Sequence, residues 1–155
     1  MTVPTLVLKS IFRYSLLMFE TVVVGADESP TAAEAVQQAI DLVKLTGGKL
    51  HIVSAYAHQQ LITGGEFANS ISSADLAQSL LDDLASRARL AGVEVTAHGK
   101  VGSPADVICE VAAEVDADLI IVGNKGMKGA RRVLGSVPNS VAHQASCSVL
   151  IAATT

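Results

Sequence analysis

Short runs of consecutive apolar residues alternate along the chain with longer segments in which apolar residues recur every three or four positions. The first run is Thr21–Val24, four β-branched residues followed by Gly25. An uninterrupted run of this kind is typical of a strand that is buried on both faces of a sheet. The pattern predicts four further strands, at residues 50–56, 93–97, 119–122 and 149–152.

The segments between these runs have the start signals, spacing and stop signals of helices. Ser29-Pro30 supplies an N-cap and a proline in the first turn, and Gly47-Gly48 ends the first segment. The expected buried face of this helix is Ala32, Ala35, Val36, Ala39, Ile40 and Val43. A second helix is expected to bury Leu76, Leu80, Leu84, Ala88 and Ala91. A third helix begins at Ser103-Pro104 and a fourth at Ser136.

Strands and helices that alternate in this way predict an α/β fold: a single doubly wound, Rossmann-like domain with a five-stranded, mostly parallel sheet and four helices. Ligands of such domains bind beyond the carboxyl ends of the strands. The loops to inspect are therefore 25–29, 55–58, 102–103 and 123–136. Residues 1–18 do not fit the pattern, so we expect an N-terminal extension of unknown role there and the domain at 19–155.

The composition narrows the class of protein. Of 155 residues, 50% are hydrophobic, 17% are charged and only 3% are aromatic. The apolar content excludes a disordered chain, and the lack of aromatic residues disfavours stacking on single-stranded nucleic acid. No apolar run reaches the ~20 residues of a membrane-spanning helix. Two cysteines are too few for a disulfide framework, so we expect a cytoplasmic protein. From the lack of aromatic residues and of long apolar runs, we expect no nucleic-acid partner and no membrane partner.

Charge is distributed unevenly. The net charge is −4, but residues 119–155 carry no acidic side chain and four basic ones. These are Lys125, Lys128, Arg131 and Arg132. A local cationic patch on an acidic protein indicates a small anion as its partner, because a nucleic-acid backbone is met by a basic face across a whole domain. The alternative is an ordinary solvated loop.

The same segment holds the strongest motif of the chain. Gly123-Asn124-Lys125-Gly126 follows a predicted strand, and Gly135-Ser136-Val137-Pro138 opens a predicted helix. Glycines allow a ligand to approach the backbone closely, and a helix start offers unpaired N–H groups to an anion. Together with the four cations, this arrangement predicts a phosphate-binding loop; the alternative is a surface loop that ends in an ordinary helix cap. It is neither a Walker A loop nor the dinucleotide fingerprint, because the spacing of its glycines differs from both.

Residues 19–153 resemble the universal stress protein family. The resemblance is carried by Val22–Asp27, Leu119–Gly123, Gly135–Pro138 and Cys147–Ile151. The ATP-binding pattern of that family is G-x2-G-x9-G-[ST]. This chain has Gly123 and Gly126 at the family spacing, but the spacer before Gly135-Ser136 has eight residues in place of nine.

The resemblance implies an adenine nucleotide alpha hydrolase-like fold with an adenine nucleotide lying across the strand ends. Asp27 would contact the ribose or the adenine, and the backbone of Ala55 would meet the adenine edge. The remaining residues of the implied site are Ala26, Gly123, Gly126, Arg131, Arg132, Gly135, Ser136 and Val137. Among them, the three glycines, Ser136 and Val137 would hold the phosphates. The alternative for Asp27 is a turn residue that accepts a hydrogen bond from its own backbone segment.

The resemblance also implies a function: a regulatory or protective module of the stress response that binds ATP, with cyclic AMP and an accompanying Mg²⁺ left open. It implies a homodimer formed through the last strand, whose apolar edge invites pairing. A slow ATPase or phosphotransferase remains an alternative, with Asp27 as its one available base, and so does a protein-binding adaptor. No catalytic residue is predicted. No metal site is predicted either, because His51, His58, His98 and His143 show no ligand spacing.

Overall fold

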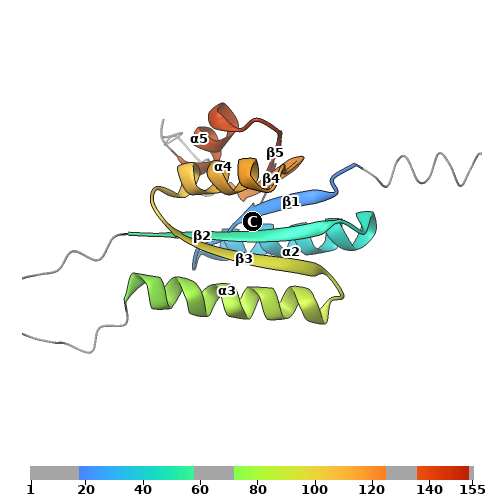
Figure 1. Cartoon of the computed structure of the whole chain (residues 1–155), viewed down its shortest axis with the longest axis horizontal. Helices are drawn as coiled ribbons and strands as arrows, with labels where there is room; N and C mark the ends of the chain where they lie inside the picture. The colour runs from blue at the N-terminus through green and yellow to red at the C-terminus, as the bar shows by residue number, and fades with distance from the viewer. Residues whose placement is uncertain (1–17, 58–71, 125–135, 154–155) are drawn as a thin grey trace, which may run out of the picture.

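The computed structural model describes residues 18–57, 72–124 and 136–153. Within them, five strands alternate with four helices (Figure 1). The elements are β1 (Thr21–Gly25), α2 (Pro30–Thr46), β2 (Lys49–Tyr56), α3 (Ser73–Leu90), β3 (Glu94–Val101), α4 (Pro104–Glu114), β4 (Leu119–Gly123), α5 (Val137–Gln144) and β5 (Ser148–Ala152). None of the helices in these ranges is long and apolar enough to cross a membrane.

The strands form one sheet in the order β3-β2-β1-β4-β5, and every neighbouring pair is parallel. The chain therefore builds outward from β1 to β3, then returns to the other side of β1 to add β4 and β5. The strand order reverses between β1 and β4, which is where ligands of doubly wound sheets bind. The predicted fold class is confirmed.

The helices cover both faces of the sheet. Val22 and Val24 of β1 pack in one cluster with α2 and α3, while Val23 packs in a second cluster with α4 and α5 (Figure 1). Successive side chains of a strand point to opposite faces, so a central strand between two helix layers needs an apolar residue at every position. This requirement explains the uninterrupted run in the sequence.

The start and end of α2 follow the predicted signals. The Ser29 side chain accepts a hydrogen bond from the Ala32 N–H at 3.2 Å, and Pro30 occupies the first turn. Gly47 takes the left-handed conformation with φ of 72°, and its N–H donates to the Val43 carbonyl at 2.8 Å. All six residues of the predicted apolar face are buried.

The predicted buried face of α3 is partly wrong. The buried residues are Ala77, Leu81, Leu84, Ala85 and Ala88, whereas Leu76 is 44% exposed. The sequence interpretation followed leucines spaced by four, but four residues turn an α-helix by about 40° more than a full turn. A row spaced only by four therefore winds away from the core, and the buried face alternates between spacings of three and four.

The third strand is longer than predicted. It spans Glu94–Val101, and all eight residues are in register with β2, from Lys49↔Glu94 to Tyr56↔Val101. The last residues of β3 include His98, Gly99 and Lys100, which do not look like a buried strand. These residues still belong to a strand, because β3 lies at the edge of the sheet, where a strand need not be buried completely.

Replacing Leu81 with alanine is expected to lower the free energy of unfolding by about 2–5 kcal/mol, because truncating a buried leucine loses apolar burial and leaves a cavity. Leu81 is 1% exposed. The matched change Leu76→Ala, on the same helix, is expected to cost under about 1 kcal/mol. Chemical denaturation of both variants gives the two values, and equal losses would contradict the assignment of the buried face.

Candidate functional site

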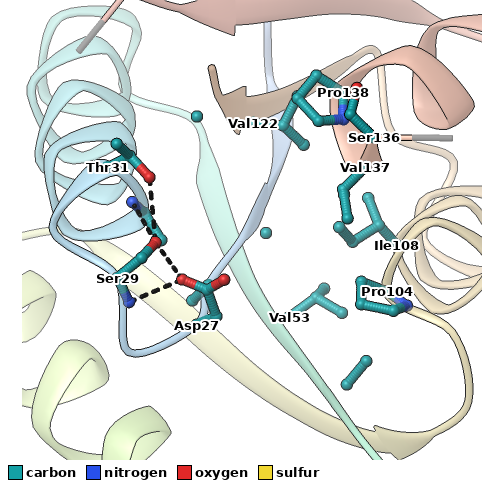
Figure 2. A pocket seen from close by; sticks show the side chains of 15 residues that line it. Asp27, Ser29, Thr31, Val53, Pro104, Ile108, Val122, Ser136, Val137 and Pro138 are labelled. Carbon is teal, nitrogen blue, oxygen red and sulfur yellow. Dashed lines mark hydrogen bonds between the residues drawn. The ribbon is translucent and has the colours of Figure 1, made fainter. Parts of the chain in front are cut away.

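A cavity of about 390 Å³ lies at the carboxyl ends of β1, β2 and β4, where the strand order reverses. Figure 2 shows it from close by. Its lining residues are Gly25, Ala26, Asp27, Ser29, Thr31, Ala32, Val53, Ala55, Pro104, Ile108, Val122, Gly123, Ser136, Val137 and Pro138. The first turns of α2, α4 and α5 all reach this cavity, because each helix of a parallel α/β sheet begins beyond the carboxyl end of the strand before it.

The two sides of the cavity differ in chemistry (Figure 2). Apolar side chains from β2, α4 and α5, among them Val53, Ile108 and Val137, form one side. Asp27, Ser29 and Thr31, from the loop after β1 and the start of α2, form the other. An apolar wall beside a few oriented polar groups is typical of a site for a small organic ligand.

Asp27 and its neighbours form a local hydrogen-bond network. The Ser29 N–H donates to Oδ1 of Asp27 at 2.8 Å, and the Ser29 hydroxyl donates to the same oxygen. Oγ of Ser29 also lies 3.1 Å from Oγ1 of Thr31. Asp27 thus has the turn role that the sequence offered as an alternative, and the same turn holds its exposed carboxylate at the cavity. The two roles are compatible.

The backbone of β2 also contributes to the cavity. The Val53 carbonyl accepts from the Ala26 N–H at 2.8 Å, on the β1 side, while the Tyr56 carbonyl accepts from the Gly102 N–H at 3.1 Å, on the β3 side. The backbone N–H and C=O groups of alternate residues in a strand point to the same side, so those of Ala55 point to the β1 side, as those of Val53 do. Because β1 pairs with β2 only as far as Val53, the N–H and C=O of Ala55 face the cavity.

Gly123 is required by packing as well as by its position at the cavity. A Cβ atom on Gly123 would lie 2.8 Å from the backbone oxygen of Thr31, in the first turn of α2. The absence of a side chain therefore lets α2 begin directly beside the end of β4. A substitution at Gly123 would disturb the fold and is no clean test of ligand binding.

Ser136 occupies the N-cap position of α5, with φ of −65° and ψ of 148°, but its side chain makes no cap hydrogen bond. Ser29, Ser72 and Ser103 each accept such a bond at the start of their helices. The sequence left two roles open for the Ser136 hydroxyl, as a helix cap or as a donor to phosphate. The structure shows no cap and places Ser136 in the cavity lining.

The structure brings together the predicted site residues that it describes. Ala26, Asp27, Ala55, Gly123, Ser136 and Val137 come from the loop after β1, from the ends of β2 and β4 and from the start of α5, and all line the cavity. Gly126, Arg131, Arg132 and Gly135 lie outside the described residues, so their roles stay predictions.

Sequence reasoning missed part of the lining: Thr31, Ala32, Val53, Pro104, Ile108, Val122 and Pro138. Pro104 directly follows the predicted helix start at Ser103, and Pro138 lies two residues after the one at Ser136. Pro30 follows Ser29 in the same way but is outside the lining, so a proline at a helix start is only a partial signal. For Val53, Ile108 and Val122 the sequence shows only core-like apolar residues.

Other reactive side chains do not form a site with the cavity. Cys109 and Cys147 are free thiols that pack against the cluster of α4 and α5, and burial raises the pKa of both. A protonated, half-buried thiol is a poor nucleophile, in line with a packing role. Among the described residues, no group of three or more His, Cys, Asp or Glu side chains could hold a metal ion.

Comparison with protein families finds a match to the Universal stress protein family over residues 18–153. A curated universal stress protein of Mycobacterium tuberculosis is 37% identical over 145 residues, which cover 88% of this chain and 98% of that protein. Universal stress protein A homolog 1 of Coxiella burnetii is 29% identical over 141 residues, which cover 85% of this chain and 94% of that protein.

Solved structures with this fold include nucleotide complexes. The crystal structure of a universal stress protein in complex with cAMP has a TM-score of 0.74 and 33% identity, and the match covers 89% of this chain and 99% of that one. The universal stress protein from Archaeoglobus fulgidus in complex with dAMP has a TM-score of 0.64 and 26% identity, over 86% of this chain and 98% of that one.

The variant Ser136→Ala is expected to change the free energy of unfolding by less than about 0.5 kcal/mol, because the hydroxyl makes no cap hydrogen bond. The matched variant Ser72→Ala is expected to cost about 1 kcal/mol, since Ser72 forms a complete capping box with Asp75. Denaturant unfolding compares the two. A loss of about 1 kcal/mol in Ser136→Ala would mean that Ser136 caps α5 after all.

Proposed function

Because the chain belongs to the universal stress protein family, we propose that its cavity binds an adenine nucleotide and that the protein acts as a nucleotide-responsive regulatory or protective module of the stress response. The observation that carries the proposal is the cavity where the strand order reverses, with an apolar wall on one side and the Asp27 turn on the other. Relatives that share the fold and at least a quarter of their residues with this chain bind cAMP and dAMP.

The chemistry of the lining suggests how the nucleotide lies. An adenine ring fits the apolar wall of Val53 and Ile108, where the backbone N–H and C=O of Ala55 can pair with its polar edge. A carboxylate accepts hydrogen bonds from ribose hydroxyls and repels phosphate, so Asp27 belongs beside the ribose. The start of α5, with Ser136 and Val137, offers N–H groups and a hydroxyl to phosphate.

We further propose ATP as a ligand, because the loop keeps the glycines and the serine of the family's ATP-binding pattern, with a spacer that is one residue shorter. Gly126, Gly135, Arg131 and Arg132 would add backbone donors and positive charge at the phosphates, and Mg²⁺ would accompany a triphosphate. Cyclic AMP is the second candidate, supported by the complex of the relative at 33% identity. Mass spectrometry of the purified protein for co-purifying adenine nucleotide, followed by calorimetric titration with ATP, cAMP and GTP, tests the proposal. Equal affinity for GTP and ATP would contradict it.

Binding without turnover fits the lining better than catalysis does. Asp27 is the one carboxylate among the described lining residues, and its Oδ1 already accepts two hydrogen bonds from Ser29. Its other carboxylate oxygen is the one proposed above to accept from the ribose, whereas a general base has to reach the attacking water beside the phosphate. We therefore propose a binding module in the cytoplasm, with the slow ATPase as the weaker alternative.

The variant Ala55→Phe is expected to weaken both ATP and cAMP at least tenfold, because the ring would occupy the space proposed for adenine. The matched control is Ala57→Phe, two residues further along the same chain segment, where the side chain is exposed and outside the lining. Calorimetry on both variants measures the affinities, and the unfolding midpoint confirms that each is folded. Unchanged affinity in Ala55→Phe would place the base elsewhere.

We also propose that the protein is a homodimer that pairs through β5. This strand lies at one edge of the sheet, and its Leu150 is 43% exposed. An apolar edge strand with unpaired backbone groups is a ready template for a second copy.

The variant Leu150→Lys is expected to shift the protein from dimer to monomer at micromolar concentration, as measured by sedimentation. Val101→Lys provides a matched control, because Val101 lies on the opposite edge strand β3 and is also 43% exposed. This control should leave the dimer intact. A monomeric parent protein, or a dimer lost only in Val101→Lys, would contradict the proposed interface.

A further inference from the structure

Two histidines that are distant in the sequence meet on the sheet. Nδ1 of His51, on β2, lies 2.9 Å from Nε2 of His98, on β3. The ring centroids are 5.2 Å apart and the rings are tilted by 34°. The strand register explains the contact, because His51 pairs with Thr96 and His98 pairs with Val53, which places the two histidines on a diagonal across neighbouring strands.

The pair lies on the face of the sheet that α4 covers. His51 and Val53 share one face because they are two residues apart in a strand, and Val53 packs in the cluster of α4. Lys100, two residues after His98, forms ion pairs with Glu110 and Glu114 of α4, at 3.0 Å and 2.6 Å. Neither histidine lines the cavity described above. The pair is therefore a separate, half-buried site near the β3 edge of the sheet.

Both rings favour the neutral state. Burial lowers the pKa of His51, and the neighbouring His98 and Lys49 lower it further, while Glu94 opposes them. Burial likewise lowers the pKa of His98, with Glu114 acting in the opposite direction and Lys100 in the same one. At neutral pH, one ring donates an N–H to the lone pair of the other, and the two facing nitrogens share a single proton.

We propose that His51 and His98 form a two-histidine binding site for a divalent transition-metal ion of the Ni²⁺ or Cu²⁺ class. Imidazole nitrogens bind such ions at about 2.0–2.1 Å. Two nitrogens at adjacent corners of a square-planar or octahedral ion, 90° apart, are then separated by about 2.9 Å, whereas tetrahedral corners are about 3.3 Å apart. The observed N···N separation equals this value, but the centroid distance of 5.2 Å shows that the two nitrogens point straight at each other, as in a hydrogen bond. To bind the ion, each ring turns about its own side-chain bonds by roughly 45°, so that both lone pairs converge on the ion, and neither strand needs to move.

The surroundings suit a cation. Four charged side chains interact with the histidines, and a fifth forms an ion pair with one of the four. They are Lys49, Glu94, Lys100, Glu114 and Glu110, and their formal charges sum to −1. When the ion binds, the donating ring moves its proton to its other nitrogen, so no proton is lost from a neutral pair. Water completes the coordination, since the described residues provide no third protein ligand. The proposal does not depend on nucleotide binding.

Calorimetric titration of tag-free protein with Ni²⁺ at pH 7.5 tests the site. We expect one ion per chain in the wild type and at least tenfold weaker binding in both His51→Gln and His98→Gln. Glutamine keeps a polar side chain of similar length and removes the ring nitrogen. His143→Gln is the matched control, because His143 is exposed on α5 and should leave the affinity unchanged. Equal affinity in the wild type and in either pair variant overturns the proposal.

A second measurement on the wild type covers the case in which a variant does not fold. Titration with Cu²⁺, whose paramagnetism broadens the NMR signals of the groups that bind it, is followed through the signals of the histidine rings. The signals of His51 and His98 should broaden together at the same Cu²⁺ concentration while those of His143 stay unchanged. Broadening of only one of the two, or of neither, overturns the proposal.

Discussion

The central strand β1 pairs with β2 on one side and with β4 on the other, and Val22, Val23 and Val24 are completely buried between two helix layers. Burying one such side chain contributes about 1.5–3 kcal/mol. Because both faces of the strand are apolar, neither α2 and α3 nor α4 and α5 can be omitted without exposing it. The same strand fixes where the chain reverses direction across the sheet, and with it the position of the cavity.

The cavity follows from this arrangement without a dedicated structural element. β1 and β4 end side by side, and the helices that follow them lie on opposite faces of the sheet, so a hollow remains between their first turns. Close packing beside the cavity depends on Gly123, because the lack of a side chain there leaves room for the backbone of Thr31. The first residue of the glycine motif is thus needed for packing and also lines the site.

Most of the fold could be predicted from the sequence, because the signals for individual helices and strands are local. The Ser29 cap, the Gly47 stop and the apolar positions of α2 each depend on residues within one or two helical turns, and all were predicted correctly. The predicted face of α3 was wrong at Leu76, since leucine spacing alone does not fix which side of a helix meets the sheet. The described part of the site was found through the family motif, whereas Ile108 and Val122 resemble ordinary core residues. The contact of His51 with His98 depends on strand register, which no local pattern encodes.

The outer parts of β2 and β3 extend beyond the end of β1. Pairing between β1 and β2 stops at Val53, but β2 and β3 stay paired as far as Tyr56 and Val101. Because side chains alternate, a deletion of one residue in this overhang would put Tyr56 on the cavity face in place of Ala55, while a change of two residues would preserve the faces. The overhang is therefore a place where evolution can alter what the cavity admits while the strands that stabilise the domain stay the same.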